Sequence, residues 1–190
     1  TDTHEKNQRH MLAQLNATTY GERIKNEIAS GIEITDALEQ VLISEDGEIH
    51  QFDTIVENLM SDSIESVQLA PNGVVTDIYP AEGNEAGKID LLHDKDRKEI
   101  SCYARDNHTI ITQGPFELKQ GGHGIAVRNP VYLKDENGQE YFWGFTIAIL
   151  RVPDIFSDAI TALSNFGYEY KISKTDAPWS DTYKVVYQSD

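Results

Sequence analysis

The chain has 190 residues, with 32 acidic and 16 basic side chains and a formal net charge of −16. A field of that sign repels phosphate backbones and anionic lipid headgroups, which argues against binding to nucleic acid or to a membrane surface. The only cysteine, Cys102, excludes a disulfide framework, and no segment approaches the ~20 apolar residues of a membrane span.

The first 30 residues follow a helical pattern. Apolar residues recur at roughly helical spacing, at Met11, Leu12, Leu15, Ile24 and Ile28. So few apolar positions favour a stalk or a dimer seam, although the same spacing also fits an amphipathic helix that lies on its own domain. Because the sequence begins inside this pattern, we expect it to be a fragment of a longer protein.

Two shorter helices are expected next. Gly31 should end the first pattern, and Thr35 is a suitable N-cap for a helix that continues to about Ile43. The apolar spacing from Phe52 to Met60 predicts a second amphipathic helix.

Strand patterns dominate the rest of the chain. Residues 64–79 predict a hairpin that turns at Pro71, Asn72 and Gly73. A helix should follow from Asp94, as its N-cap, to Arg105. Three strands are then expected at residues 110–118, 123–133 and 141–152, and the continuous apolar run of the third favours a central strand covered on both faces. A helix from residue 153 to residue 163 and two strands, at 168–172 and 183–187, complete the pattern.

This order predicts an α+β fold. It would consist of a long N-terminal helix, a PAS-like five-stranded antiparallel sheet with its helices on one face and a pocket between, and a short C-terminal α/β appendage. We divide the chain into residues 1–60 (stalk and short helices), 61–165 (sensor core) and 166–190 (C-terminal strands).

No constellation of residues for catalysis is present in the sequence. His93, His108 and His123 lack the spacing of a metal site, and Cys102 has no evident catalytic partner. We therefore expect a domain without enzymatic activity, metal or cofactor.

Several blocks of the sequence resemble the CHASE domain, the extracytoplasmic sensor of bacterial diguanylate cyclases and histidine kinases and of plant cytokinin receptors. The similarity covers about residues 60 to 165, and the blocks are residues 89–92, 94–105, 114–118, 124–127, 129–132 and 143–145. Phe166 to Tyr170 is similar to the segment that follows the domain in cyclase-type members. The resemblance implies an extracellular or periplasmic domain between two membrane spans, a homodimer built along the N-terminal helices, and a cytoplasmic output module.

Two charged residues stand out under this resemblance. Asp90 occupies the place of an aspartate that binds the purine in cytokinin-binding members, whereas Arg128 replaces a pocket threonine. A guanidinium is shaped for carboxylate or phosphate, so Arg128 favours an anionic ligand or an internal pair with Asp90. Strand alternation places Gly124, Ala126 and Arg128 on one face of the sheet. That face either lines a pocket or faces solvent, and in the second case Arg128 would form a surface ion pair. The sequence leaves both possibilities open.

The predicted function is that of a sensor domain that binds a small molecule, with an anionic one favoured by Arg128, and relays the signal to an output module such as a diguanylate cyclase or histidine kinase. The predicted ligand-binding residues are Asp90, Leu92, Tyr103, Phe116, Arg128, Tyr132, Phe145 and Ile147. The alternative is a dimerisation or protein-interaction module with a collapsed core and no small-molecule ligand.

Overall fold

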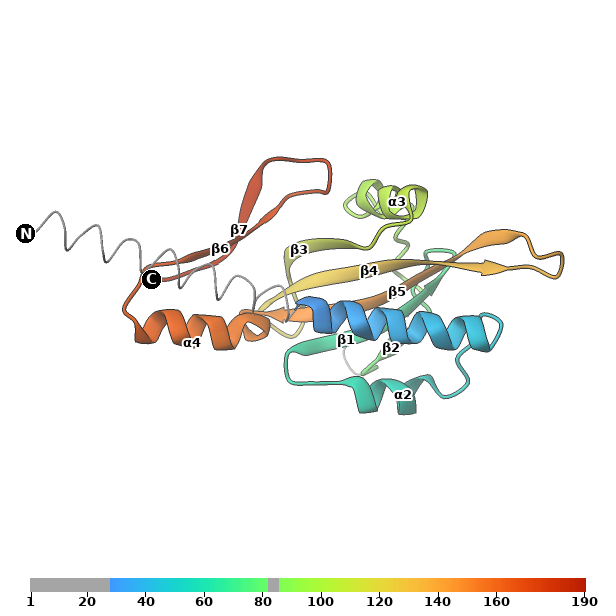
Figure 1. Ribbon diagram of the computed structural model, residues 1–190, viewed down its shortest axis with the longest axis horizontal. Helices are drawn as coiled ribbons and strands as arrows, with labels where there is room; N and C mark the ends of the chain where they lie inside the picture. Colours follow the sequence, from blue (N-terminus) through green and yellow to red (C-terminus); the bar gives the residue numbers. More distant parts are fainter. Residues whose placement is uncertain (1–27, 82–85) are drawn as a thin grey trace, which may run out of the picture.

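The computed structural model describes residues 28–81 and 86–190 (Figure 1). In chain order the elements are a helix over residues 28–44, α2 (Phe52–Leu59), β1 (Ile64–Pro71), β2 (Asp77–Tyr79), α3 (Lys98–Asn107), β3 (Ile111–Glu117), β4 (His123–Lys134), β5 (Glu140–Val152), η1 (Asp154–Phe156), α4 (Ser157–Asn165), β6 (Lys171–Thr175) and β7 (Tyr183–Gln188). The stalk and dimer seam predicted from the first residues fall mostly in residues 1–27, outside the described part of the chain.

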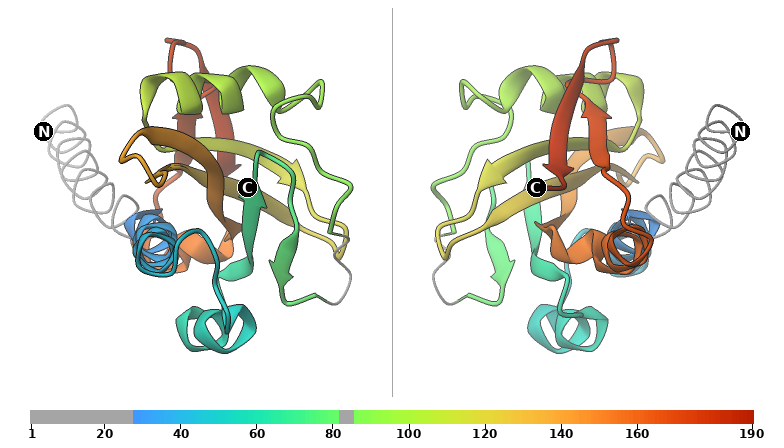
Figure 2. Two further views of the ribbon diagram at one scale, coloured as in Figure 1. Left: turned by 90° about the vertical axis from the view of Figure 1, so that its right-hand side faces the viewer. Right: turned by 90° about the vertical axis from the view of Figure 1, so that its left-hand side faces the viewer.

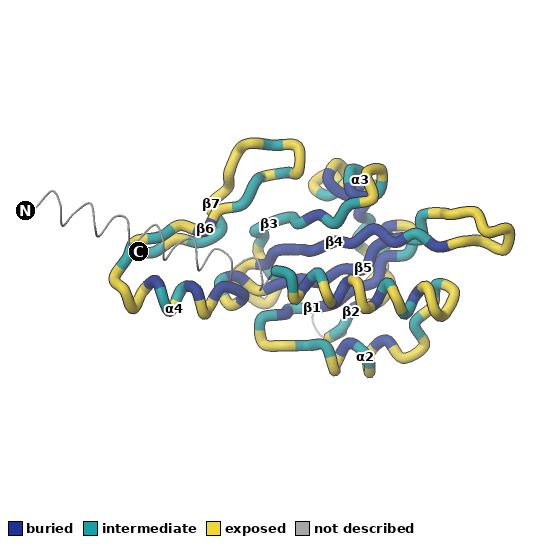
Figure 3. Tube along the Cα trace, in the orientation of Figure 1, coloured by how far each residue is buried: buried dark blue, intermediate teal, exposed yellow. Residues whose placement is uncertain are grey.

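Five antiparallel strands form the main sheet, in the order β2-β1-β5-β4-β3. β5 lies at the centre and its middle residues are buried, as the tube in Figure 3 shows, so the predicted central strand is confirmed. The predicted α+β, PAS-like arrangement is confirmed with it. The hairpin between β1 and β2 turns at Asn72 and Gly73, whose φ angles of 56° and 87° belong to the left-handed region that Asn and Gly tolerate.

One face of the sheet packs against the helix of residues 28–44 and against α2. Leu38 and Leu42 of the first helix and Val56 of α2 join Val127 and Leu150 of the sheet in one core cluster. Burial of these aliphatic side chains holds the helices on the sheet, because each fully buried Leu or Val contributes about 1.5–3 kcal/mol.

The predicted break at Gly31 is wrong, since residues 28–44 form one uninterrupted helix. A Cβ atom at position 31 would lie 2.9 Å from Leu150 Cδ2, so the missing side chain lets the helix approach β5 closely. Thr35 is likewise not an N-cap. Its Oγ1 donates to the carbonyl of Ile32 within the helix, and its own carbonyl accepts a hydrogen bond of 2.9 Å from Thr146 Oγ1 on β5.

The opposite face of the sheet carries α3, so the predicted placement of the helices on one face is wrong: they divide between the two faces (Figure 2). Ile100 and Ala104 of α3 pack with Ile111, Phe145 and other apolar residues of the sheet in a second core cluster. α3 begins at Lys98, four residues after the predicted start. Asp94 is not its N-cap, because the Asp94 carboxylate instead accepts hydrogen bonds from the Asp90 backbone and the Arg97 side chain.

The C-terminal strands form a separate antiparallel hairpin, β6–β7, as predicted. Its base reaches the first core cluster through Ile172, while its far end stands beside α3 (Figure 1). The rings of Tyr103 on α3 and Trp179 in the β6–β7 loop lie 5.1 Å apart. Within residues 28–81 and 86–190, no helix is both long and apolar enough to cross a membrane.

Candidate functional site

A cavity of about 260 Å³ opens on the sheet face that carries α3. Its floor is made by alternate residues of the central strands, and loop residues 88–97 and the end of β3 form its sides. Gly124 on this face of β4 lets Leu118 of the wall lie close to the sheet, because a Cβ atom at position 124 would be 2.8 Å from Leu118 Cδ2. The apolar side chains of the walls are Ile78, Ile89, Leu91, Phe116, Leu118, Ile147 and Ile149.

Arg128 is the charged residue in the floor of this cavity. It sits on β4 between Ile111 of β3 and Ile147 of β5, and it is only 4% exposed. Its NH1 group donates a hydrogen bond to Gln113 Oε1, whereas its buried Nε has no hydrogen-bond partner. No carboxylate pairs with it among the described residues. A buried guanidinium without a counter-ion is costly, so this arrangement is one that an anion would stabilise.

The pKa of Arg128 reflects the same environment. Burial, and after it the positive charge of Arg97, lower it to about 9. The group is still protonated at neutral pH. Two of the possibilities that the sequence left open are therefore excluded: Arg128 does not face solvent, and it does not pair with Asp90.

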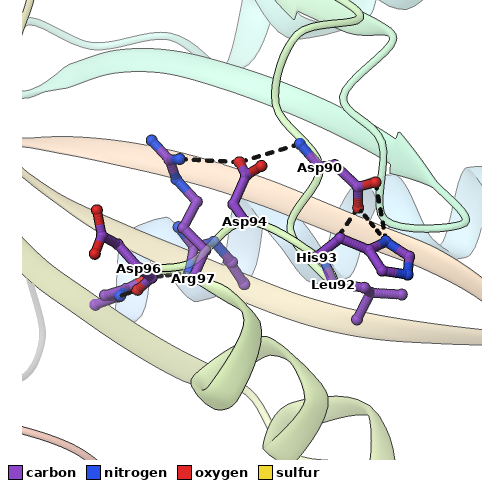
Figure 4. Close-up of polar contacts among 8 residues, drawn as sticks. Asp90, Leu92, His93, Asp94, Asp96 and Arg97 are labelled. Carbon is purple, nitrogen blue, oxygen red and sulfur yellow. Dashed lines mark hydrogen bonds and ion pairs between the residues drawn. The ribbon is translucent and has the colours of Figure 1, made fainter.

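A polar network in the loop before α3 positions Arg97 at the cavity wall (Figure 4). Asp94 Oδ2 accepts hydrogen bonds from Arg97 NH1 at 3.1 Å and from the Asp90 backbone N–H at 3.2 Å. Gln113 connects this loop to the floor, because its Nε2 donates to the Asp96 carbonyl at 2.7 Å while its Oε1 accepts from Arg128. A shift of Arg128 on ligand binding would therefore be transmitted directly to the loop.

Three of the eight predicted site residues line the cavity: Phe116, Arg128 and Ile147. Asp90 lies outside it. Its carboxylate accepts a hydrogen bond from the Leu92 backbone N–H at 3.3 Å and lies 2.9 Å from His93 Nδ1, so it organises the loop. The Leu92 side chain packs beside Gly73, at the turn of the first hairpin.

The remaining three predicted residues are aromatic and also lie outside the cavity walls. Phe145 is fully buried in the second core cluster, Tyr103 packs against Trp179, and Tyr132 stacks on His108. Their placement fits the more common role of buried aromatic residues, which is packing.

The sequence analysis missed Arg97, Gln113 and Ile149. Gln113 could have been found, because it is the diagonal cross-strand neighbour of Arg128 once β3 and β4 are paired. Ile149 follows Ile147 by two residues and so shares its face of β5. Nothing in the local pattern pointed to Arg97, whose position depends on the network around Asp94.

No group of three His, Cys, Asp or Glu residues that could hold a metal ion occurs in the described part of the chain. The site thus offers an unpaired buried cation, apolar surface and the buried polar side chains of Ser66 and Gln68, with the carboxylates of Glu65 and Glu117 also in its walls. Such a set suits binding of an anionic organic molecule.

Comparison with known proteins gives a family and a fold. The family model described as CHASE domain matches residues 9–181. No curated protein matches the sequence. The structure is similar to that of an extracellular ligand binding receptor from Desulfohalobium retbaense, with a TM-score of 0.60, 20% identity, and coverage of 86% of this chain and 29% of that one. It is less similar to the ligand-binding domain of the Campylobacter jejuni chemoreceptor Tlp3 in complex with 4-methylisoleucine, with a TM-score of 0.43, 16% identity, and coverage of 76% of this chain and 62% of that one.

Proposed function

This chain belongs to the CHASE domain family, and from that premise we propose that it is a non-catalytic, extracellular or periplasmic sensor domain that binds a small organic anion. The observation that carries the proposal is Arg128, which is buried in a cavity floor without a carboxylate partner among the described residues. An anion that reached Arg128 would replace the lost hydration of the guanidinium, and charge-assisted hydrogen bonds of this kind are the strong ones.

The rest of the cavity indicates what the anionic group is attached to. Besides Arg128, the buried part of the wall combines the polar side chains of Ser66 and Gln68 with the aliphatic side chains of Leu91, Ile147 and Ile149. A short apolar body would bury surface there, at about 25 cal/mol per Å². The volume of about 260 Å³ is small, so the ligand we propose is a compact one with a single anionic head.

The signalling step would run through the sheet to the helix of residues 28–44. Asn129, the neighbour of Arg128 on β4, projects from the opposite face and donates a hydrogen bond of 3.1 Å to Glu39 of that helix. Thr146 on β5 makes a second such link, to the Thr35 carbonyl. A ligand that moved β4 relative to β5 would therefore act on the helix, provided that it binds the two conformations with different affinity.

The wider assignment follows from family membership and is also a proposal. It places residues 1–60 as the stalk of a homodimer, residues 61–165 as the sensor core, and residues 166–190 as the connection towards a second membrane span. The output module would lie in the cytoplasm and would be a diguanylate cyclase or a histidine kinase. The cavity favours this assignment over a protein-interaction module, whose core would be packed solid.

The experiment is a series of straight-chain six-carbon compounds with different head groups, in which hexanoate and hexanamide also share the same alkyl tail. Hexanoate, hexyl phosphate and hexanesulfonate carry the anion, and hexanamide is the neutral control. Isothermal titration calorimetry should give an affinity for at least one of the anions that is tenfold or more above that for hexanamide, and the difference should vanish in Arg128→Met. Equal binding of all four compounds, or unchanged anion binding in the variant, would contradict the proposal.

A further inference from the structure

A second cavity, of about 330 Å³, lies on the other side of Arg128. It shares Arg97, Phe116, Glu117 and Arg128 with the first cavity, so the two spaces meet around these four residues. Its outer wall comes from the C-terminal hairpin, through Asp176 and Lys184. An anion held at Arg128 from this side would therefore lie between the sheet and the hairpin.

Two lysine residues of the hairpin face each other next to this cavity. Lys184 on β7 lies directly opposite Lys174 on β6, and like charges in such a cross-strand pair destabilise the hairpin. Lys174 is half-buried, and burial lowers its pKa, with the charge of Lys184 lowering it further while Asp176 raises it. An anion close to Lys184 would relieve this repulsion.

The carboxylates around the second cavity do not cancel this attraction. Asp96, Glu117 and Asp176 also line it, but all three are exposed, whereas Arg128 is buried. Water screens exposed charges far more effectively than buried ones. The field at the buried end of the cavity is therefore set by Arg128 and Arg97, whereas at the open end Lys184, which is also exposed, lies among these carboxylates.

We propose that Lys184 is an additional ligand-binding residue, and that an anion bound at Arg128 draws the β6–β7 hairpin against the sheet and α3. This inference rests on the proposed anion-sensing function and adds to it a second moving part besides the helix of residues 28–44. The hairpin is the last element of the described chain, so its closure would report occupancy of the site at the C-terminal end.

The structure provides a reporter for this closure. Trp179 in the hairpin loop is 48% exposed and lies against Tyr103 of α3. The only other tryptophan, Trp143, is on β5 and donates a hydrogen bond to the Gly47 carbonyl, away from the hairpin. A change in tryptophan fluorescence that disappears in Trp179→Phe therefore reports movement of the hairpin.

The test uses the whole chain and the compounds hexanoate, hexyl phosphate and hexanesulfonate. Saturation should change the fluorescence of the wild type and not that of Trp179→Phe. Lys184→Gln should weaken binding by roughly two- to fivefold, because an exposed charge contributes little more than that, and it should reduce the fluorescence change. Lys184→Arg should restore both. Lys171→Gln, at the base of the same hairpin, is the matched control and should leave both unchanged.

Two other outcomes separate this inference from the proposed function. If an anion binds in an Arg128-dependent way, but Lys184→Gln binds it as tightly as the wild type and Trp179 gives no signal, the sensor proposal stands and the role of the hairpin is refuted. If none of the three anions shows binding that depends on Arg128, the proposed function fails and the inference fails with it.

Discussion

Replacing Arg128 with methionine should make the ligand-free protein more stable while it abolishes anion binding. The guanidinium has a pKa of about 9, well below its usual value, mainly because burial disfavours its charged form. At ~1.4 kcal/mol per pKa unit, the charge costs on the order of 5 kcal/mol in the folded state. Methionine fills much of the same space without a charge and adapts to irregular cavities.

The expected gain is smaller than that cost, because the substitution also removes an interaction. The hydrogen bond from Arg128 NH1 to Gln113 Oε1 is lost, which costs about 1–3 kcal/mol when the acceptor keeps no other partner. We therefore expect the free energy of unfolding to rise by about 2–4 kcal/mol, which corresponds to roughly 4–16 °C in Tm for a protein of this size. Replacement of buried charges by apolar residues in other proteins gives gains of about 1–4 kcal/mol.

Urea unfolding followed by circular dichroism measures this change directly. Lys134→Met is the matched control: it removes one positive charge from the same strand, in a chain of net charge −16, at an exposed position. The control should be neutral to slightly destabilising. A loss of 1 kcal/mol or more in Arg128→Met, beyond that of the control, would refute the reasoning, because it would mean that Arg128 serves the fold and not a ligand.

Two further predictions follow from the same site. The pKa of Arg128 is lower in the folded state than in the unfolded state, so the charged guanidinium destabilises the fold fully below pH 9 and progressively less above it. The stability gained by Arg128→Met should therefore be largest near pH 7.5 and smaller at pH 10, as measured by urea unfolding at both pH values. Ile149→Phe should narrow the first cavity and weaken hexanoate binding tenfold or more with little change in the pKa of Arg128, since Ile149 lines the apolar wall; unchanged calorimetric affinity would place the apolar body of the ligand elsewhere.

The strands were predictable because their signals are local. The alternation along β4 correctly separated Ile125 and Val127 from Ala126 and Arg128, and the apolar run of β5 correctly placed it at the centre of the sheet. The helix boundaries were less predictable because distant contacts decide them. Gly31 lies within a helix because its missing side chain lets the helix pack closely against Leu150, a residue more than a hundred positions away in the sequence.

The site was predictable only in part, for a related reason. Residue type singled out Arg128, yet its burial depends on how the loop of residues 88–97 and β3 close over β4. Asp90 was attractive as a pocket acid because of its apolar neighbours, but its carboxylate turns to the Leu92 backbone and to His93 within the loop. Short polar side chains often satisfy nearby backbone groups in this way, and strand or helix patterns do not reveal it.

The most direct test of the central claim is the ¹H–¹⁵N resonance of Arg128 Nε, assigned by its absence in Arg128→Met. In the ligand-free protein this N–H group is buried without an acceptor. Saturation with the anion of the six-carbon series that binds most tightly should shift this resonance strongly downfield, while hexanamide should leave it in place. An anion that binds and stabilises the protein without moving the Arg128 Nε resonance would contradict the account.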